Sequence, residues 1–301
     1  MEDNRESMTL SEISGAISWD LIRRAKRERE FFNQHTDPAA IPDALLRVPA
    51  QLDAIPDEVA AYMPSLKDKQ VCEVGCGYGV ISCYFARQGA HVRSFDVSET
   101  NVCIASRAAQ VNGVMERLSL QVMQGECLAF ADDSFDLVFG NAVLHHLDIA
   151  AGAREIYRVL KPGGVAIFRE PLGENRLLEW TRNCSLRSSN HRHTADEHSL
   201  RYRDVEVLRT VFPKVVFRES ELLSVLGYLL RKAEVGMIAV PGWQRTVRAL
   251  TKLDRWLLAR VPPLRRLASY SVISLFKPDR PQDAGSTAAC RSSVRPQTLT
   301  G

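Results

Sequence analysis

Two adjacent histidines, His145 and His146, are the residues of this chain best suited to acid–base chemistry. Histidine titrates near neutral pH and can take a proton from a hydroxyl or from an acidic carbon. Both follow residues 134–139, an apolar run that predicts a strand. The alternative role is to cap or pack the start of a helix. Because adjacent helical residues project about 100° apart, only one can face a pocket, and we favour His145, which is nearer the strand end.

A candidate ligand-binding turn lies at residues 71–80, where a predicted strand ends in Gly75, Gly77 and Gly79 and a predicted helix begins. Glycine lets the backbone approach a ligand closely, and the N–H groups at a helix start attract a polar or anionic group. Glu73, inside the strand, would repel a pyrophosphate but suits a ligand with an amino group. The alternative is a tight turn that binds nothing.

A second carboxylate, Asp96, directly follows a predicted strand at residues 91–95. It lies about 20 residues after the glycine turn, the spacing at which a nucleotide-binding fold holds the ribose hydroxyls. The sequence therefore predicts that Asp96 binds a ribose.

The elements around these residues alternate as short strands and helices. Strands are predicted at residues 71–74, 91–95, 118–123, 134–139, 165–168, 214–220 and 269–277. This order predicts an α/β fold, a Rossmann-like doubly wound sheet of seven mostly parallel strands. Ligands bind at the carboxyl ends of the strands in such sheets. Gly75, Asp96, Glu126, Asn141 and Glu170 all fall at these ends.

Residues 66–171 resemble the class I S-adenosylmethionine (SAM)-dependent methyltransferases, most closely the ubiquinone-biosynthesis-type small-molecule branch. The resemblance implies SAM as cofactor and an antiparallel last strand at the sheet edge beside the sixth. It assigns the methionine part of SAM to Glu73, Gly75, Gly77 and Gly79, the ribose to Asp96, and the adenine to Glu126 and Cys127. Cys76, Val97 and Asn141 are assigned to the cofactor site with them.

An N-terminal helical lid is expected over residues 1–64, followed by the methyltransferase domain at 65–277. Its charged helix begins near Trp19, and we expect Trp19, Ile22, Lys26 and Arg29 to share one side and Glu28 to lie on a solvated face. The candidates to contact substrate are Phe31, Phe32, Tyr62, Arg169 and Glu170. The alternative for the three aromatic residues is that they pack the lid onto the core.

Two insertions and a tail complete the predicted organisation. A polar loop at 172–200 contains His191, His193, Asp196, Glu197 and His198, but the spacing matches no closed zinc site, so no metal is predicted. The second insertion, at 222–268, is basic and amphipathic. We favour a helical hairpin that closes the substrate pocket, and the alternative is a peripheral contact with an anionic membrane or with a partner. Residues 278–301 are expected to be a disordered tail.

Composition describes an ordinary globular protein: 301 residues, 45% hydrophobic, 25% charged, with a formal net charge of +3. The seven cysteines show no zinc-type pairing and suit a reducing cytoplasm. No signal peptide and no apolar stretch long enough to span a bilayer is visible. The small net charge gives no support to nucleic-acid binding. Residues 140–143 read Gly-Asn-Ala-Val, unlike the Asn-Pro-Pro-Tyr-type motif of enzymes that methylate nucleic-acid amino groups.

The function that follows is methyl transfer from SAM to a small, fairly hydrophobic molecule, at an oxygen. The runner-up is a C-methyltransferase acting on a quinone-, isoprenoid- or polyketide-like carbon. From a different class, the chain could be a non-catalytic SAM-binding protein whose basic insertion binds a membrane or partner. Glu73 and the lack of a separate substrate domain weaken a fourth interpretation, a nicotinamide oxidoreductase.

Overall fold

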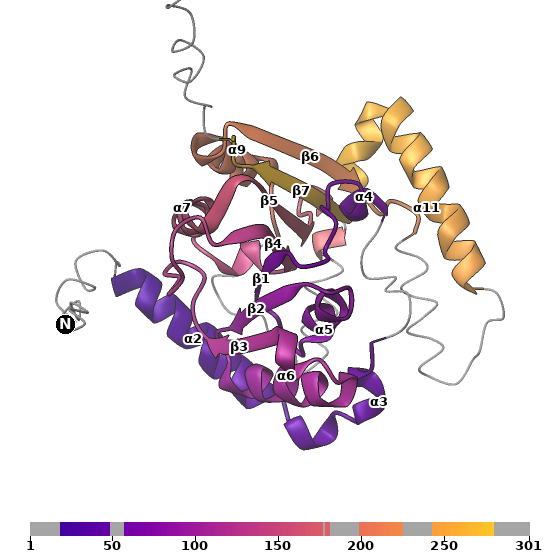
Figure 1. The fold of residues 1–301 in the computed structure, drawn as a ribbon. Helices are drawn as coiled ribbons and strands as arrows, with labels where there is room; N and C mark the ends of the chain where they lie inside the picture. The colour runs from indigo at the N-terminus through magenta and orange to yellow at the C-terminus, as the bar shows by residue number, and fades with distance from the viewer. Residues whose placement is uncertain (1–18, 49–56, 177, 181–198, 225–242, 280–301) are drawn as a thin grey trace, which may run out of the picture.

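A computed structural model describes residues 19–48, 57–176, 178–180, 199–224 and 243–279 (Figure 1). The histidine-rich part of the first insertion, residues 225–242 of the second and most of the tail lie outside the described residues, as does the beginning of the lid.

Seven strands of the described chain form one sheet in the order β3-β2-β1-β4-β5-β7-β6. They are β1 (Gln70–Val74), β2 (His91–Asp96), β3 (Leu118–Val122), β4 (Phe135–Asn141), β5 (Leu160–Pro171), β6 (Lys214–Ser220) and β7 (Tyr270–Phe276). Strands β1 to β5 pair in parallel, and β7 runs antiparallel to both β5 and β6. The predicted α/β sheet is confirmed. One detail was wrong: β7 lies between β5 and β6, so the edge strand is β6 and not the last strand.

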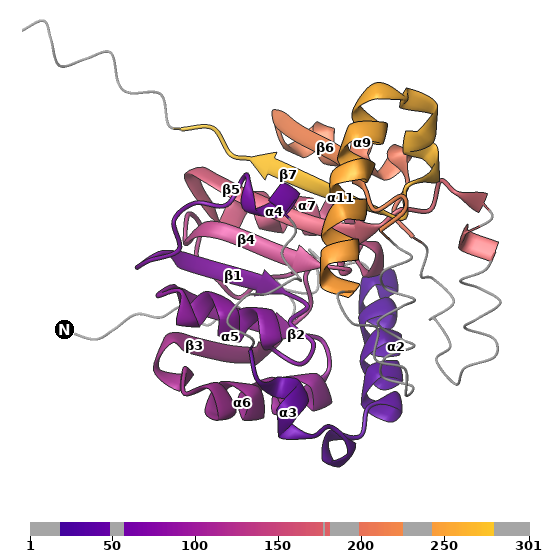
Figure 2. The same ribbon diagram turned by 90° about the vertical axis from the view of Figure 1, so that its right-hand side faces the viewer.

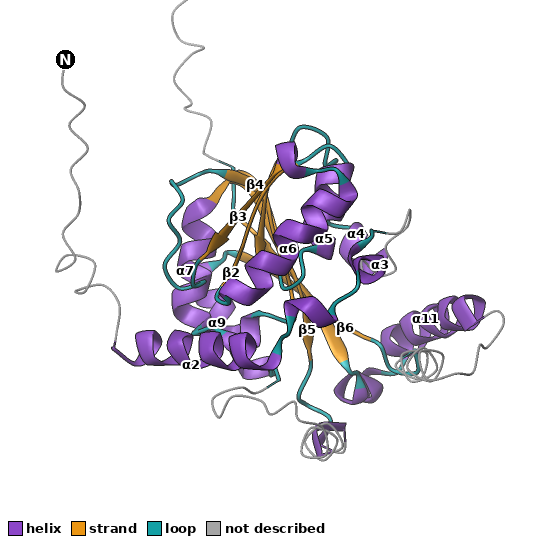
Figure 3. Ribbon diagram, turned by 90° about the horizontal axis from the view of Figure 1, so that it is seen from below, coloured by secondary structure: helices purple, strands orange, loops and turns teal. Residues whose placement is uncertain are grey.

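Alternating side chains of the central strands fill two cores, one on each face of the sheet. Cys72 and Val138 pack on the face covered by α7 (Ile149–Val159) and α9 (Tyr202–Val211). Val71 and Leu137 pack on the other, covered by α5 (Val80–Arg87) and α6 (Glu99–Asn112). Figure 3 shows the sheet nearly edge-on between these two helix layers. Because both faces are buried, the central strands are mostly apolar, and Glu73 in β1 is an exception.

Helix starts are fixed by side-chain caps next to the carboxyl ends of the strands. Ser98 accepts a hydrogen bond from the N–H of Asn101 at the start of α6, and Asp148 accepts one from Ala151 at the start of α7. The short elements are η1 (Pro38–Ala40), α3 (Asp43–Leu46), α4 (Asp57–Ala60), η2 (Met115–Arg117), η3 (Leu144–His146) and η4 (Pro262–Leu267).

Helix α2 (Trp19–His35) lies at the carboxyl ends of β1 and β2, toward which the strand arrows point (Figure 2). The expectation for its faces was wrong. Trp19 is 70% exposed, whereas Glu28 is 5% exposed. A helix with charges on nearly every side gives no clear apolar stripe, so periodicity alone does not identify its buried face.

Helix α11 (Trp243–Arg260) leads through η4 into β7. Tyr270, the first residue of β7, pairs with Pro171 at the end of β5, so η4 also lies at the carboxyl ends of the parallel strands. Among the described residues, no helix combines the length and the apolar character needed to cross a bilayer.

Candidate functional site

A cavity opens where the strand order reverses between β1 and β4, the position at which doubly wound sheets bind ligands. Its floor comes from the ends of β1, β2 and β4 and the loop after β3, and α2 forms its roof. The lining residues are Arg24, Ala25, Glu28, Phe32, Val74, Gly75, Gly77, Phe95, Asp96, Val97, Asn101, Met123, Gln124, Gly125, Glu126, Asn141, Ala142, Val143, His146 and Leu147.

The glycine loop between β1 and α5 is left-handed at Gly75, Gly77 and Gly79, with φ values of +65°, +50° and +73°. A Cβ on Gly75 would lie 2.5 Å from Val143, and one on Gly79 would lie 2.7 Å from Ala105 of α6. A Cβ on Gly77 would meet nothing within 4 Å. Gly75 and Gly79 are therefore needed for packing, whereas the space beside Gly77 is available to a ligand.

Asp96 connects β2 to the glycine loop. Its carboxylate accepts hydrogen bonds from the N–H of Gly77 at 2.9 Å, the N–H of Ser98 at 3.0 Å and the side-chain amide of Asn101 at 3.2 Å. Burial raises the pKa of Asp96 above its ordinary value, although these hydrogen bonds act in the opposite direction. A ligand that donates hydrogen bonds to this carboxylate would relieve the cost of its burial.

Glu126 and Asn141 line other parts of the same cavity. Glu126 accepts a hydrogen bond of 2.9 Å from the N–H of Asp148, and burial raises the pKa of its carboxyl group. Asn141 accepts a hydrogen bond of 3.1 Å from Arg169, whose guanidinium also pairs with Glu221 and lies over the Tyr270 ring. Arg169 is not one of the lining residues, and its hydrogen bond holds the side chain of Asn141 in place.

The two histidines take different positions. His146 lines the cavity, while His145 is buried and its Nδ1 lies 2.7 Å from a carboxylate oxygen of Glu170. The other oxygen of Glu170 accepts the N–H groups of Val143 and Leu144, each at 2.9 Å. Glu170 and His145 thus hold the turn η3 in place. His145, the histidine that we favoured as the base, is not among the lining residues, whereas His146 is.

Helix α2 contributes Arg24, Glu28 and Phe32, spaced four residues apart on one face, to the roof of the cavity. Oε2 of Glu28 lies 3.1 Å from Nδ1 of His146, and the Phe32 ring meets the His146 ring edge-on at 5.8 Å between centroids. Arg24 donates to the backbone carbonyl of His145 at 3.2 Å. Sequence reasoning missed Arg24 and Glu28, because the surrounding charges hid the four-residue spacing that connects them to Phe32.

Glu73 does not line the cavity. Its carboxyl group is buried and accepts a hydrogen bond from the hydroxyl of Ser82, which also contacts Ser94 at 2.8 Å. Burial raises the pKa of Glu73 to about 8, so the side chain keeps its proton at neutral pH. The expected contact with an amino group stays a prediction, and the structure gives this residue a second role in the core.

Several other residues assigned to the site lie outside the cavity lining. Cys76 contributes a backbone hydrogen bond of 2.9 Å to Phe95, and Cys127 is exposed. Phe31 packs on Phe32 and His35. The expectation for Tyr62 was wrong. Its ring packs on Phe276, which pairs with Val165 near the amino end of the parallel stretch of β5. Tyr62 therefore lies at the amino ends of the strands, opposite the cavity.

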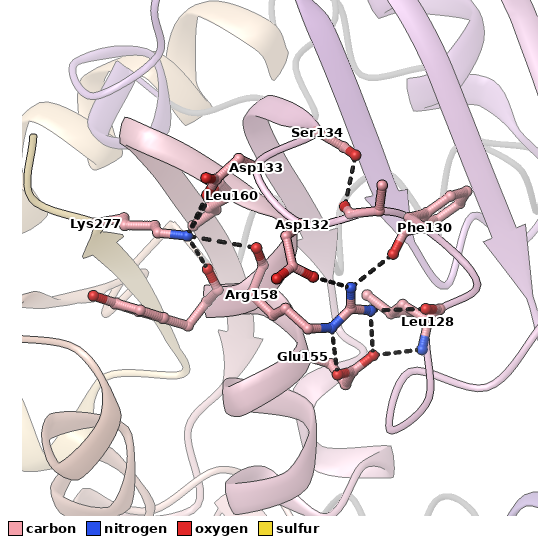
Figure 4. A network of polar contacts seen from close by, with 11 residues as sticks. Leu128, Phe130, Asp132, Asp133, Ser134, Glu155, Arg158, Leu160 and Lys277 are labelled. Carbon is pink, nitrogen blue, oxygen red and sulfur yellow. Dashed lines mark hydrogen bonds and ion pairs between the residues drawn. The ribbon is translucent and has the colours of Figure 1, made fainter. Parts of the chain in front are cut away.

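The loop that supplies Glu126 continues into a polar network that fixes residues 128–134 (Figure 4). Arg158 of α7 donates to the carbonyls of Leu128 and Phe130 at 2.8 and 2.7 Å, and to Asp132 and Glu155 at 2.7 to 2.9 Å. Lys277, just after β7, donates to Asp133 and to the carbonyl of Leu160, both at 2.7 Å. These bonds fix the segment between β3 and β4 from two elements that are distant in sequence.

The residues present fit SAM. Three carboxyl groups, from Glu28, Asp96 and Glu126, line the cavity, and such a site favours a ligand that carries a sulfonium and an ammonium group. Asp96 lines the cavity, and its expected contact with a diol stays a prediction, while the space beside Gly77 leaves room for a close approach. Among the residues the structure describes, no cluster of three or more metal-ligating side chains is found.

Comparison with known families matches residues 72–168 to a family described as "Methyltransferase domain". The chain is 35% identical over 101 residues to the ubiquinone biosynthesis O-methyltransferase of Rhizobium johnstonii, covering 33% of this chain and 40% of that protein. It is 33% identical over 113 residues to the malonyl-[acyl-carrier protein] O-methyltransferase of Erwinia billingiae, covering 37% and 43%. It is 30% identical over 150 residues to methyltransferase GfsG of Streptomyces halstedii, covering 48% and 51%. The chain thus spans about half or less of the length of these relatives.

Solved structures share the fold over more of the chain. The geranyl diphosphate C-methyltransferase of Streptomyces coelicolor superposes with a TM-score of 0.56 and 14% identity, covering 84% of this chain and 97% of that one. Phosphoethanolamine N-methyltransferase 2 of Haemonchus contortus, solved with SAM, gives a TM-score of 0.56 and 17% identity, covering 83% and 60%. At these identities the likeness establishes the fold.

Proposed function

The chain carries a class I SAM-dependent methyltransferase domain, and we propose that it transfers a methyl group to an oxygen of a small, fairly apolar molecule. The observation that carries the proposal is the position of His146, which lines the same cavity as Gly77 and Asp96. A base beside the cofactor is useful when the acceptor carries a proton that must leave, as a hydroxyl does. Two of the relatives are named as O-methyltransferases, which supports oxygen as the acceptor atom.

In this proposal the chain supplies binding, alignment and a base. Gly77 and Asp96 hold the cofactor, and the roof helix α2 excludes water from the cavity. When bound, SAM supplies a methyl group activated by the positive sulfur, and its transfer leaves S-adenosylhomocysteine. His146 takes the proton of the acceptor hydroxyl, so that the oxygen forms its bond to carbon without developing a positive charge.

C-methylation of a quinone-, isoprenoid- or polyketide-like carbon is the second candidate. It is favoured by the same position of His146 in the cavity, because imidazole can also take a proton from an acidic carbon. The atom that receives the methyl group therefore has to be identified in the product.

The test is incubation of the protein with ¹³C-methyl-labelled SAM and a metabolite extract, with phenolic quinols and isoprenoid diphosphates as defined acceptors. The proposal predicts a labelled product whose ¹³C chemical shift is that of a methyl ether. A label on carbon would favour the second candidate. SAM binding with no transfer to any acceptor would contradict both and indicate a non-catalytic SAM-binding protein.

We also propose that α11 and η4 form a peripheral contact with an anionic membrane. Four large apolar side chains are exposed there, Leu253, Trp256, Val261 and Leu267, with exposed fractions between 37% and 51%. Residues 243–267 contain seven Lys or Arg and one acidic residue, Asp254, which is buried and accepts backbone N–H groups of residues 222–224. Exposed apolar side chains among basic ones favour an anionic lipid surface.

The expected hairpin closing the substrate pocket is less well supported, since no described residue of α11 lines the cavity. Sedimentation with vesicles tests the membrane contact. Binding should occur with phosphatidylglycerol vesicles, weaken with salt, and be lost when Leu253 and Trp256 are replaced by Ser. Trp19→Ser, an exposed tryptophan elsewhere, should leave binding unchanged. Equal binding of native protein to neutral vesicles, or none to either, would contradict the proposal.

A further inference from the structure

Two histidine–glutamate pairs lie next to each other at the cavity, and they come from different parts of the chain. The inner pair joins His145 to Glu170, at the carboxyl end of β5. The outer pair joins His146 to Glu28, on helix α2. The two imidazole rings lie 4.2 Å apart between centroids. The inner pair belongs to the sheet and fixes the turn, whereas the outer pair exists only when α2 covers the cavity.

We infer that Glu28 is a positioning residue for His146, so that the base is complete only when helix α2 is docked over the cavity. This inference rests on the proposed function. A carboxylate near Nδ1 favours the imidazole tautomer that carries its proton on Nδ1, and in that tautomer Nε2 is the proton acceptor. A carboxylate that accepts a hydrogen bond from Nδ1 fixes both tautomer and ring orientation. Oε2 of Glu28 and Nδ1 of His146 are close enough for such a bond at 3.1 Å, although their present alignment does not form one.

The burial of Glu28 supports this role. Its side chain is 6% exposed, although neighbouring positions of the helix are charged and solvated. Placing a carboxylate in a cavity costs free energy unless a partner compensates. One group close to its carboxylate is the imidazole of His146, whose Nδ1 lies 3.1 Å from Oε2. Arg24, four residues earlier on the same helix, lines the same cavity. The other carboxyl groups lining the cavity, Asp96 and Glu126, lie on the strand side of the cavity and bind backbone N–H groups.

The docking of α2 depends on contacts that are separate from the Glu28–His146 pair. Asn33 accepts a hydrogen bond of 2.6 Å from Ser98 and donates one of 2.6 Å to Glu99. Arg29 donates to the carbonyl of Val97 at 3.1 Å. The helix is therefore attached at one end to residues 97–99, which follow Asp96, and meets the turn η3 through Glu28. Closure over the cofactor and alignment of the base would then occur together.

The test compares Glu28→Leu, which removes the acceptor at similar volume, with Glu28→Gln, which keeps an acceptor oxygen. Glu30→Leu is the matched control, because Glu30 lies on the exposed side of the same helix and pairs only loosely with Lys26, at 3.7 Å. The first measurement is a ¹⁵N–¹H spectrum of the imidazole of His146, assigned with His146→Gln, which needs neither substrate nor activity. Native protein and Glu28→Gln should show the proton on Nδ1, and Glu28→Leu should show the other tautomer or a mixture.

The second measurement is methyl transfer to the acceptor found above. Glu28→Leu should lower kcat on the order of tenfold to a hundredfold, a smaller loss than removal of the base itself, while the KM for SAM changes less than about twofold. Glu28→Gln should keep most of kcat, and Glu30→Leu should match the native protein. An unchanged tautomer in Glu28→Leu, or a raised KM with native kcat, would overturn the inference. Absence of methyl transfer by native protein would contradict the proposed function instead.

Discussion

Oδ2 of Asp96 lies 2.9 Å from the backbone nitrogen of Gly77 and accepts its N–H, which joins the end of β2 to the loop after β1. Both residues line the cavity, and the start of α6 is held by further hydrogen bonds from Ser98 and Asn101 to the same carboxylate. The shape of the cofactor cradle therefore depends on a side chain that is itself expected to bind the ligand.

A side chain at position 77 should allow the protein to fold but should prevent it from binding the cofactor. Its Cβ would meet nothing within 4 Å, while φ is +50°, so Gly77→Val should cost about 1–3 kcal/mol of stability through backbone strain. The valine would occupy space that the ligand needs, and affinity for S-adenosylhomocysteine should fall at least about a hundredfold. Gly79→Ala should instead act mainly on stability, because its Cβ would lie 2.7 Å from Ala105. Normal affinity in folded Gly77→Val would show that this loop is not the cradle.

Glu73 should make stability depend on pH. Its pKa is about 8 in the folded protein because of burial, and 4.5 is the ordinary value. Between these values the folded state holds a proton that the unfolded state releases, so the free energy of unfolding should fall as pH rises, by roughly 1 kcal/mol per pH unit. Glu73→Gln cannot titrate and keeps an acceptor for Ser82. In urea titrations, the free energy of unfolding of Glu73→Gln minus that of the native protein should increase from about pH 5 to pH 8. A difference that stays constant over this range would contradict the role of Glu73.

Replacing His146 and replacing His145 should affect different properties of the protein, turnover in the first case and stability in the second. His146→Gln should lower kcat by about 10²–10⁴-fold with nearly native affinity for S-adenosylhomocysteine, because it removes the proton acceptor and leaves the cradle. His145→Gln should mainly lower stability, by about 2 kcal/mol, since Oε2 of buried Glu170 loses its contact with the imidazole. If both variants keep full turnover, catalysis works by alignment alone.

Arg158 should contribute to stability through the network in Figure 4. Its guanidinium donates to Leu128, Phe130, Asp132 and Glu155, so Arg158→Gln should lose about 2–3 kcal/mol in urea unfolding. Arg209→Gln is the control, because Arg209 forms an exposed pair with Glu206 and should contribute close to nothing. A loss no larger than that of the control would mean that the network is not needed for folding.

The sheet was predictable because its central strands are buried on both faces and read as short apolar runs between glycines and helices. The place of β7 was not, since strand order depends on long-range pairing with β5 that no local pattern encodes. Asp96 and Asn141 reach the cavity because they end strands, and Gly77, Glu126 and His146 reach it because they lie in the short connections that follow strands. Glu28 was misassigned and Tyr62 misplaced, because both belong to the N-terminal segment, whose position over the sheet depends on tertiary contacts and not on its own periodicity.

The most direct test of the account is calorimetric titration of S-adenosylhomocysteine into native protein and Asp96→Ala. Charge-assisted hydrogen bonds from two ribose hydroxyls should be worth on the order of 2 kcal/mol, so affinity should fall about thirtyfold. Glu116→Ala, which removes an exposed carboxylate on η2, is the control and should bind like the native protein. Native affinity in a folded Asp96→Ala variant, or no binding to the native protein, would contradict the assignment of this cavity to SAM.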